Sequence, residues 1–168
     1  MALWFTGLPC SGKTSISEAL HSRLRKENLH SYVLDGDMIR KGLSADLDFS
    51  ENGRRENIRR VGEVAKLFVE SGLIILVALI SPYRNDRSQV RKIFKPDQFV
   101  EVYLDCPIGV CERRDVKGMY KKARKGEIRD FTGISSPYEP PINPEIRLQT
   151  HKQALEECVD VIYGYLTF

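Results

Sequence analysis

The chain has 168 residues, of which 42% are hydrophobic and 29% charged, and its formal net charge is +3 at pH 7. This length and composition predict a single soluble domain spanning residues 1–168. The small positive charge does not by itself indicate nucleic-acid binding, although it suits a site that holds several phosphates. The longest apolar stretch, residues 72–80, is too short to cross a bilayer, and no signal peptide is evident. We therefore expect a cytoplasmic protein that binds neither membranes nor nucleic acid.

Short apolar runs alternate with stretches of helical periodicity along the chain, which predicts an α/β domain with a parallel sheet. The predicted strands cover Ala2–Thr6, Ser31–Asp35, residues 73–80, Phe99–Leu104 and, as a short last strand, Ile146–Leu148. The predicted helices cover Lys13–Lys26, residues 57–71, residues 107–114 and residues 151–166. Between the last two helices lie a basic, glycine-containing segment at 115–136 and a proline-rich loop at 137–144.

The segment after the first predicted strand, GLPCSGKT, fits the phosphate-binding pattern G-x-x-x-x-G-K-[ST] between a strand and a helix. Gly7 and Gly12 permit backbone conformations that aim successive N–H groups at phosphate oxygens, and the helix N-terminus adds its dipole. Lys13 can reach the β- and γ-phosphates, and the hydroxyl of Thr14 can ligate Mg²⁺. We therefore expect this P-loop to bind ATP through Gly7, Leu8, Pro9, Cys10, Ser11, Gly12, Lys13 and Thr14.

A P-loop alone does not separate kinases from GTPases and other ATPases. A GTPase would carry the guanine-reading pattern N-K-x-D, and the nearest match, residues 94–97, has Phe94 where asparagine is needed. Residues 115–118 match a D-x-x-G switch, but so short a pattern is common by chance. The pattern therefore disfavours a GTPase.

Carboxylates, arginines and one aromatic residue follow the second predicted strand, at the end of the sheet where ligands bind in open α/β folds. Asp35 and Asp37 would face the γ-phosphate and hold Mg²⁺ or deprotonate an acceptor hydroxyl, although an ordinary Asp-Gly turn explains them too. Phe49 suits stacking on a base and filling the core equally. The arginines suit a forked grip on a phosphate or sulfate, or a solvated helix face. They are Arg40, Arg54, Arg55, Arg59 and Arg60.

Residues 115–130 are rich in lysine and arginine, with Gly118 and Gly126 between them. A mobile cationic lid of this kind would exclude water from the phosphates and neutralise charge in the transition state. The alternatives are a solvated basic loop and a nucleic-acid patch. Basic and aromatic residues do not alternate here as they do on nucleic-acid-binding sheets, which disfavours the patch.

Six long segments of the chain match the pattern of a known family in order. They are FTGLPCSGKTSIS, LDGDMIRKGL, RRENIRRVGEVAKLFVESG, ISPYRNDR, VYLDCPIGVCERRDVKGMYKKARKGEI and FTGISSPYEPP. Through them the chain resembles the adenylyl-sulfate kinase (APS kinase) family over almost its full length. This resemblance implies a P-loop kinase fold, with a mostly parallel five-stranded sheet flanked by helices and a basic lid. It also implies transfer of a phosphoryl group from ATP to the 3′-hydroxyl of adenylyl sulfate in sulfate assimilation, with Mg²⁺ as cofactor. A homodimer and functional coupling to ATP sulfurylase are further expectations.

The resemblance also implies roles for single residues. Lys13, Asp35 and Asp37 would be catalytic, Thr14 and Asp37 would hold the metal, and Arg113 would flank the adenine of ATP. The residues in contact with adenylyl sulfate would be Asp37, Arg40, Phe49, Arg54, Asn57, Ile80, Ser81, Lys117 and Phe131. The two phenylalanines would cover the two faces of its adenine. A nucleoside monophosphate or shikimate-type kinase remains an alternative, as does a catalytically silent nucleotide-binding module.

Overall fold

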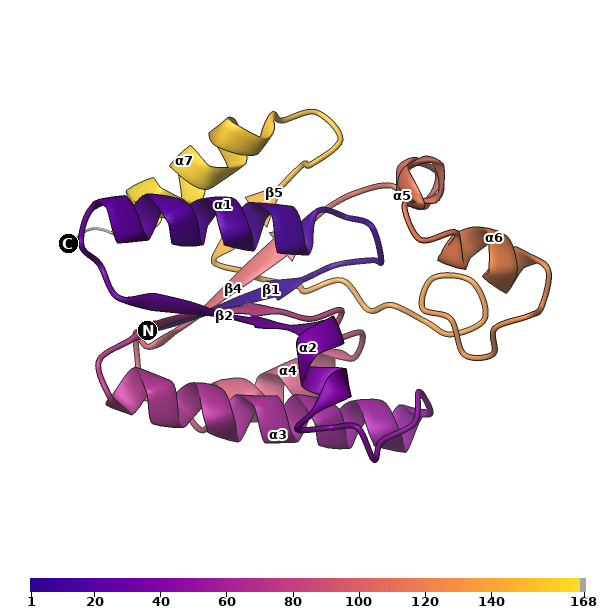
Figure 1. Ribbon diagram of the computed structural model, residues 1–168, viewed down its shortest axis with the longest axis horizontal. Helices are drawn as coiled ribbons and strands as arrows, with labels where there is room; N and C mark the ends of the chain where they lie inside the picture. Colours follow the sequence, from indigo (N-terminus) through magenta and orange to yellow (C-terminus); the bar gives the residue numbers. More distant parts are fainter. Residues whose placement is uncertain (167–168) are drawn as a thin grey trace.

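The computed structural model describes residues 1–166, which are built around a five-stranded sheet in which all neighbouring strands are parallel (Figure 1). The strand order is β2-β3-β1-β4-β5. The strands are β1 (Ala2–Thr6), β2 (Ser31–Asp35), β3 (Ile74–Ala78), β4 (Phe99–Leu104) and β5 (Ile146–Leu148). Only β3 differs from its predicted range. It ends before residue 80 because the chain turns away from the sheet and reaches a φ of +47° at Ser81.

Helices flank the sheet on both faces. They are α1 (Lys13–Lys26), α2 (Gly36–Lys41), α3 (Glu51–Glu70), α4 (Arg84–Arg91), α5 (Ile108–Arg114), α6 (Met119–Arg124) and α7 (Leu155–Tyr165). The prediction for α1 is confirmed. The prediction that the next long helix begins at residue 57 is wrong, because the hydroxyl of Ser50 accepts a hydrogen bond from the N–H of Gly53 (3.1 Å) and caps α3 earlier.

The start of α7 and three short helices also differ from the prediction. α7 begins at Leu155 rather than at residue 151, because the carboxylate of Glu157 accepts a hydrogen bond from the N–H of Ala154 (2.8 Å) and caps the helix there. The helices α2, α4 and α6 were not predicted. In α4 the buried residues are Asp86, Arg87 and Val90, so no apolar stripe marks the helix.

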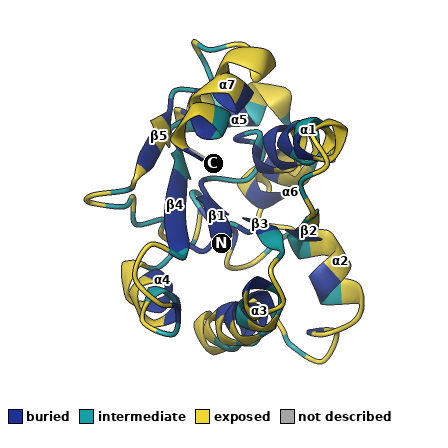
Figure 2. Cartoon of the chain, turned by 90° about the vertical axis from the view of Figure 1, so that its left-hand side faces the viewer, coloured by how far each residue is buried: buried dark blue, intermediate teal, exposed yellow. Residues whose placement is uncertain are grey.

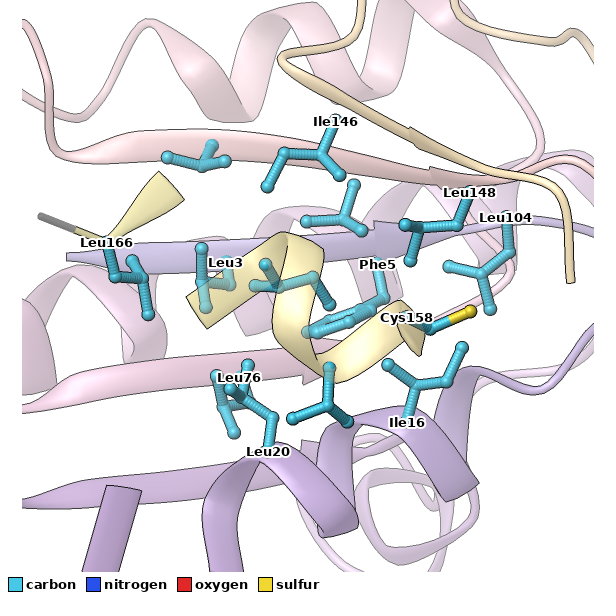
Figure 3. Close-up of a cluster of buried hydrophobic side chains, with 14 of the residues drawn as sticks. Leu3, Phe5, Ile16, Leu20, Leu76, Leu104, Ile146, Leu148, Cys158 and Leu166 are labelled. Atoms are coloured by element: carbon cyan, nitrogen blue, oxygen red, sulfur yellow. The ribbon is translucent and has the colours of Figure 1, made fainter. Parts of the chain in front are cut away.

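The alternation of side chains along β1 divides the core into two layers. Leu3 and Phe5 face α1 and α7 (Figure 3), whereas Ala2 and Trp4 face α3 and α4. In Figure 2 the helices lie on both sides of the sheet, with their buried residues toward it and their exposed residues outward. Because β1 is the central strand and is buried on both faces, the segment after it starts from the middle of the sheet. Within residues 1–166, no helix is both long and apolar enough to cross a membrane.

Candidate active site

The P-loop connects β1 to α1 at the carboxyl end of the sheet. A Cβ at Gly7 would lie 2.8 Å from Oγ of Ser11 and 2.9 Å from the carbonyl oxygen of Leu104, so only glycine fits there. Gly12 has a φ of +104° and forms the N-cap of α1 without a side-chain hydrogen bond. The first N–H groups of α1 are therefore not capped by that residue and can receive a phosphate.

The ammonium group of Lys13 lies inside the P-loop. Its Nζ donates hydrogen bonds to the carbonyl oxygens of Gly7 (3.0 Å) and Leu8 (2.8 Å). The side chain is 9% exposed, and this burial lowers the pKa of Lys13 to about 8. A bound phosphate would favour the charged form instead. The structure thus holds the cation where the phosphates of a nucleotide would lie.

A chain of polar contacts leads from the P-loop to the lid. Oγ1 of Thr14 donates to Oδ2 of Asp35 (2.8 Å), and Oδ1 of Asp35 accepts from the backbone N–H of Asp37 (2.9 Å). Asp35 is therefore the N-cap of α2, and Gly36 is the first residue of that helix. The carboxylate of Asp37 forms an ion pair with Lys117, and this pair raises the pKa of Lys117. Both predicted carboxylates thus lie beside the P-loop.

Arg40 and Arg54, two of the clustered arginines, contact Phe49. Nε of Arg54 donates to the carbonyl of Phe49 (2.8 Å) and Nη2 to that of Asp130 (2.6 Å). The guanidinium of Arg40 lies 4.4 Å from the centroid of the Phe49 ring. Burial and then the charge of Arg54 lower the pKa of Arg40, and an anionic ligand would relieve this repulsion.

The other arginines of the cluster form ion pairs. Arg59 pairs with Glu56, and Arg60 pairs with Glu56 and Asp46. Arg55 pairs with Glu51 and Asp86. They fit the solvated-face interpretation, because neutralising partners already surround them.

The two phenylalanines differ in burial. Phe49 is 59% exposed, so it does not fill the core, whereas Phe131 is 8% exposed and packs edge-on against Tyr120 with a centroid distance of 5.0 Å. Arg54 bonds to the backbone of Phe49 and of Asp130, so it joins the two loops that carry the phenylalanines. Asp130 has a φ of +54°, a left-handed backbone conformation that aspartate adopts more readily than most other residues.

Asn57, Ile80 and Ser81 are the remaining residues expected to contact the acceptor. Asn57 lies one turn after Arg54 on α3, is 5% exposed, and its Oδ1 has no hydrogen-bond partner among the described residues, so it can serve a ligand. Ile80 is half-buried after β3. Ser81 is 2% exposed, and its Oγ accepts a hydrogen bond from Nε1 of Trp4 (2.9 Å). The hydroxyl of Ser81 is therefore already engaged inside the fold.

The lid segment carries α6 and lies beyond the carboxyl ends of the strands (Figure 1). Asp115, which matches the D-x-x-G pattern, accepts hydrogen bonds from the N–H groups of Tyr120 and Lys121 (3.0 Å each), so it fixes the start of α6 instead of acting as a switch. Arg113 is exposed on α5, and its side chain makes no hydrogen bond or ion pair within residues 1–166, which leaves its guanidinium available to a ligand.

Sequence reasoning missed two residues that bond to the P-loop. The hydroxyl of Tyr120 donates to the carbonyl of Pro9 (3.0 Å), and the buried hydroxyl of Thr150 donates to the carbonyl of Ser11 (2.8 Å). The only available signal was an aromatic residue within a basic segment for Tyr120, and none marks Thr150.

Comparisons with known proteins agree with this geometry. A family model described as adenylylsulphate kinase matches residues 1–149. A probable adenylyl-sulfate kinase from Halalkalibacterium halodurans is 58% identical over 164 residues, which cover 98% of this chain and 81% of the relative. The structure of an APS kinase from Mycobacterium tuberculosis in complex with AMPPNP and APS is 45% identical with a TM-score of 0.94, covering 98% of this chain and 96% of that one. A shikimate kinase from Aquifex aeolicus, 21% identical with a TM-score of 0.55 over 99% and 96% of the two chains, shares the fold alone.

Proposed function

The chain belongs to the adenylyl-sulfate kinase family, and we propose that the side chains around its P-loop transfer the γ-phosphoryl group of ATP to the 3′-hydroxyl of adenylyl sulfate. The products are ADP and 3′-phosphoadenylyl sulfate. The observation that carries this assignment is the run of contacts from Thr14 through Asp35 to Asp37, which sets a carboxylate beside the P-loop. Phe49 and Arg54 supply an aromatic face and a cation on the acceptor side.

On the donor side, the backbone N–H groups of the P-loop and of the first turn of α1 bind the phosphates of ATP. Lys13 leaves the carbonyl groups of Gly7 and Leu8 and places its charge against the β- and γ-phosphates. Arg113 flanks the adenine. Because the backbone N–H groups are already oriented in the folded chain, little reorganisation of the P-loop backbone accompanies the build-up of negative charge during transfer.

On the acceptor side, the adenine lies between Phe49 and Phe131, and Arg40, Arg54 and Asn57 bind the anionic phosphate–sulfate group. Ile80 and Ser81 form one wall of the pocket, and Lys117 closes it from the lid. Asp37 accepts the proton of the 3′-hydroxyl as its oxygen attacks the γ-phosphorus. For this step Lys117 releases Asp37 and turns to the substrate, so the ion pair between them belongs to the ligand-free enzyme.

Mg²⁺ fits the oxygen atoms at this site. The hydroxyl of Thr14 lies 2.8 Å from Oδ2 of Asp35, and hydroxyl and carboxylate oxygens are the ligands that Mg²⁺ prefers. Thr14 and Asp37 would hold the cation, with Asp35 behind them. When bound, the cation neutralises charge on the β- and γ-phosphates.

The assembly and cellular setting rest on the family resemblance. Residues 1–168 act as one kinase domain, form a homodimer, and work in the cytoplasm in sulfate assimilation. Functional coupling to ATP sulfurylase would keep the concentration of adenylyl sulfate low by consuming it as it forms.

The acceptor decides between this function and its alternatives. ADP release should be measured with adenylyl sulfate, AMP and shikimate as acceptors at equal concentration, and the phosphorylated product identified by mass spectrometry. We expect turnover with adenylyl sulfate and a product phosphorylated at the 3′-position. Turnover with AMP or shikimate alone would contradict the assignment, and no turnover with any acceptor would favour a silent nucleotide-binding module.

Replacing Arg54 with alanine should weaken acceptor binding more than ATP binding. In the wild type the guanidinium of Arg54 joins the loops of Phe49 and Asp130, and we expect it to bind the anionic group of the acceptor. Losing a charged hydrogen bond of this kind should raise KM for adenylyl sulfate about 10- to 100-fold, with KM for ATP nearly unchanged. Steady-state kinetics with each substrate varied in turn measures both constants.

Arg59→Ala is the matched control, because Arg59 lies on the same helix but is 60% exposed and paired with Glu56. It should leave both constants as in the wild type. If Arg54→Ala raised KM for ATP as much as KM for adenylyl sulfate, Arg54 would lie outside the acceptor site.

Replacing Thr14 with valine should raise the Mg²⁺ concentration needed for half-maximal turnover about tenfold or more, since one oxygen ligand is lost. Titrating Mg²⁺ at fixed ATP measures this requirement. Thr14→Ser keeps the hydroxyl and should stay close to the wild type. An unchanged Mg²⁺ requirement in the valine variant would remove Thr14 from the metal site.

A further inference from the structure

Arg87 is a buried arginine that the mechanism above does not use. It lies on α4, is 3% exposed, and its guanidinium bonds to three different segments of the chain. Nε donates to Oε1 of Glu101 on β4 (2.7 Å), Nη1 to the carbonyl of Ser81 after β3 (2.5 Å), and Nη2 to the carbonyl of Glu139 in the proline-rich loop (2.7 Å). The three donors of one planar guanidinium thus join strand β4, the loop after β3 and the proline-rich loop.

Stability alone does not explain an arginine at this position. The Arg87–Glu101 pair is 3% and 11% exposed, and desolvation of such a buried pair offsets much of its attraction. An apolar pair of similar size often stabilises a fold equally well. What an apolar side chain or a lysine cannot reproduce is the fixed fork of donors that reaches both carbonyl groups.

The first of these carbonyl groups belongs to a constrained segment. Ser81 has a φ of +47°, a conformation that non-glycine residues rarely adopt. Its carbonyl accepts hydrogen bonds from Arg87 (2.5 Å) and from Oγ1 of Thr6 (3.3 Å), and its hydroxyl accepts one from Trp4. Strained backbone persists where surrounding contacts hold it, and such sites often have a function. Here the contacts fix the wall of the proposed acceptor pocket.

The second carbonyl group belongs to the segment that follows Phe131. Glu139 donates its N–H to the carbonyl of Pro82 (2.8 Å), and its carboxylate accepts the N–H of Arg84 (2.8 Å). The hydroxyl of Tyr138 lies 2.9 Å from Oγ1 of Thr6. Tyr138 is therefore anchored to β1, and Glu139 to the loop after β3, in the segment that continues from the Phe131 loop.

We propose that Arg87 is a positioning residue for the acceptor: its guanidinium fixes the loop of Ser81 relative to the segment that follows Phe131, and so sets the two sides of the adenylyl-sulfate pocket. Arg87 touches no substrate and acts through the backbone of Ser81 and Glu139. The inference rests on the proposed function, because it assigns Ser81 and Phe131 to the acceptor pocket. None of the three hydrogen bonds of Arg87 reaches the P-loop, so we expect Arg87 to affect binding of the acceptor and not of ATP.

The test is Arg87→Lys with Arg91→Lys as the matched control. Lysine keeps the charge opposite Glu101 but cannot bond both carbonyl groups. Arg91 lies on the same helix and near the same carboxylate (3.5 Å), but it bonds to Glu145 instead of the two pocket segments. We expect Arg87→Lys to raise KM for adenylyl sulfate about tenfold or more, with KM for ATP and affinity for ADP unchanged. Arg91→Lys should match the wild type in all three.

A second variant, Arg87→Met combined with Glu101→Leu, separates positioning from stability. An apolar pair replaces the ion pair, so the variant should lose only the stability that the carbonyl groups of Ser81 and Glu139 owe to Arg87, remain folded, and still show the raised KM for adenylyl sulfate. An unchanged KM for adenylyl sulfate in a folded variant would overturn the proposal. An equal rise in KM for adenylyl sulfate and for ATP would also overturn it, as would unfolding of both variants. If the wild type itself does not use adenylyl sulfate, the proposed function fails rather than the role of Arg87.

Discussion

Replacing Asp37 with alanine should nearly abolish turnover while nucleotide binding persists. Asp37 follows the N-cap of α2 and presents an exposed carboxylate beside the P-loop, where it would take the proton of the acceptor hydroxyl. Loss of such a base commonly costs about 10²- to 10⁴-fold in rate, and we expect kcat to fall by that factor. The P-loop itself is untouched, so the affinity for ADP, measured by calorimetry, should remain close to the wild type.

Asp46→Ala is the control for this variant. Asp46 is an exposed aspartate in the connection between α2 and α3, and its partner is Arg60. The substitution removes an equal charge near the site without touching the P-loop or Asp37, so kcat should be unchanged. Near-normal kcat in Asp37→Ala would assign proton transfer to another group.

Replacing Lys13 with methionine should impair both ATP binding and transfer. The methionine side chain has a similar length but carries no charge, so the β- and γ-phosphates lose the cation that the P-loop holds between the carbonyls of Gly7 and Leu8. Removing one charge-stabilising donor commonly costs about 10²- to 10³-fold, and we expect kcat/KM for ATP to fall by at least that much. Steady-state kinetics at saturating adenylyl sulfate measures it.

Lys26→Met provides the comparison, since Lys26 lies in the last turn of the same helix, far along it from the P-loop. It should leave kcat/KM for ATP unchanged. A Lys13→Met variant that retains wild-type affinity for ATP would show that the ammonium group does not bind the phosphates.

The P-loop and the sheet could be predicted from the sequence because their signals are local. Eight consecutive residues specify the loop, and the strand and helix around it were predicted with the bounds that the structure shows. Asp35 and Asp37 follow from their place at the end of β2. These features need only short-range patterns, and the family resemblance adds expected residue roles that patterns alone left open, such as stacking of Phe49 on the adenine of the acceptor.

The rest of the site depends on contacts between distant parts of the chain. The bond from Thr150 to Ser11 spans 139 positions, and Arg54 reaches Asp130 across 76. Arg87 was missed for a different reason: the inward side of α4 is polar, so hydrophobic periodicity predicts no helix there. A buried side chain that bonds to backbone carbonyls leaves no pattern in the sequence, and only the fold reveals it.

The most direct test is a crystal structure of the enzyme with ADP, Mg²⁺ and adenylyl sulfate. The account predicts the adenine of adenylyl sulfate between the rings of Phe49 and Phe131, with its 3′-hydroxyl within hydrogen-bonding distance of Asp37 and facing the P-loop. An acceptor bound elsewhere, or a 3′-hydroxyl turned away from Asp37, would contradict it.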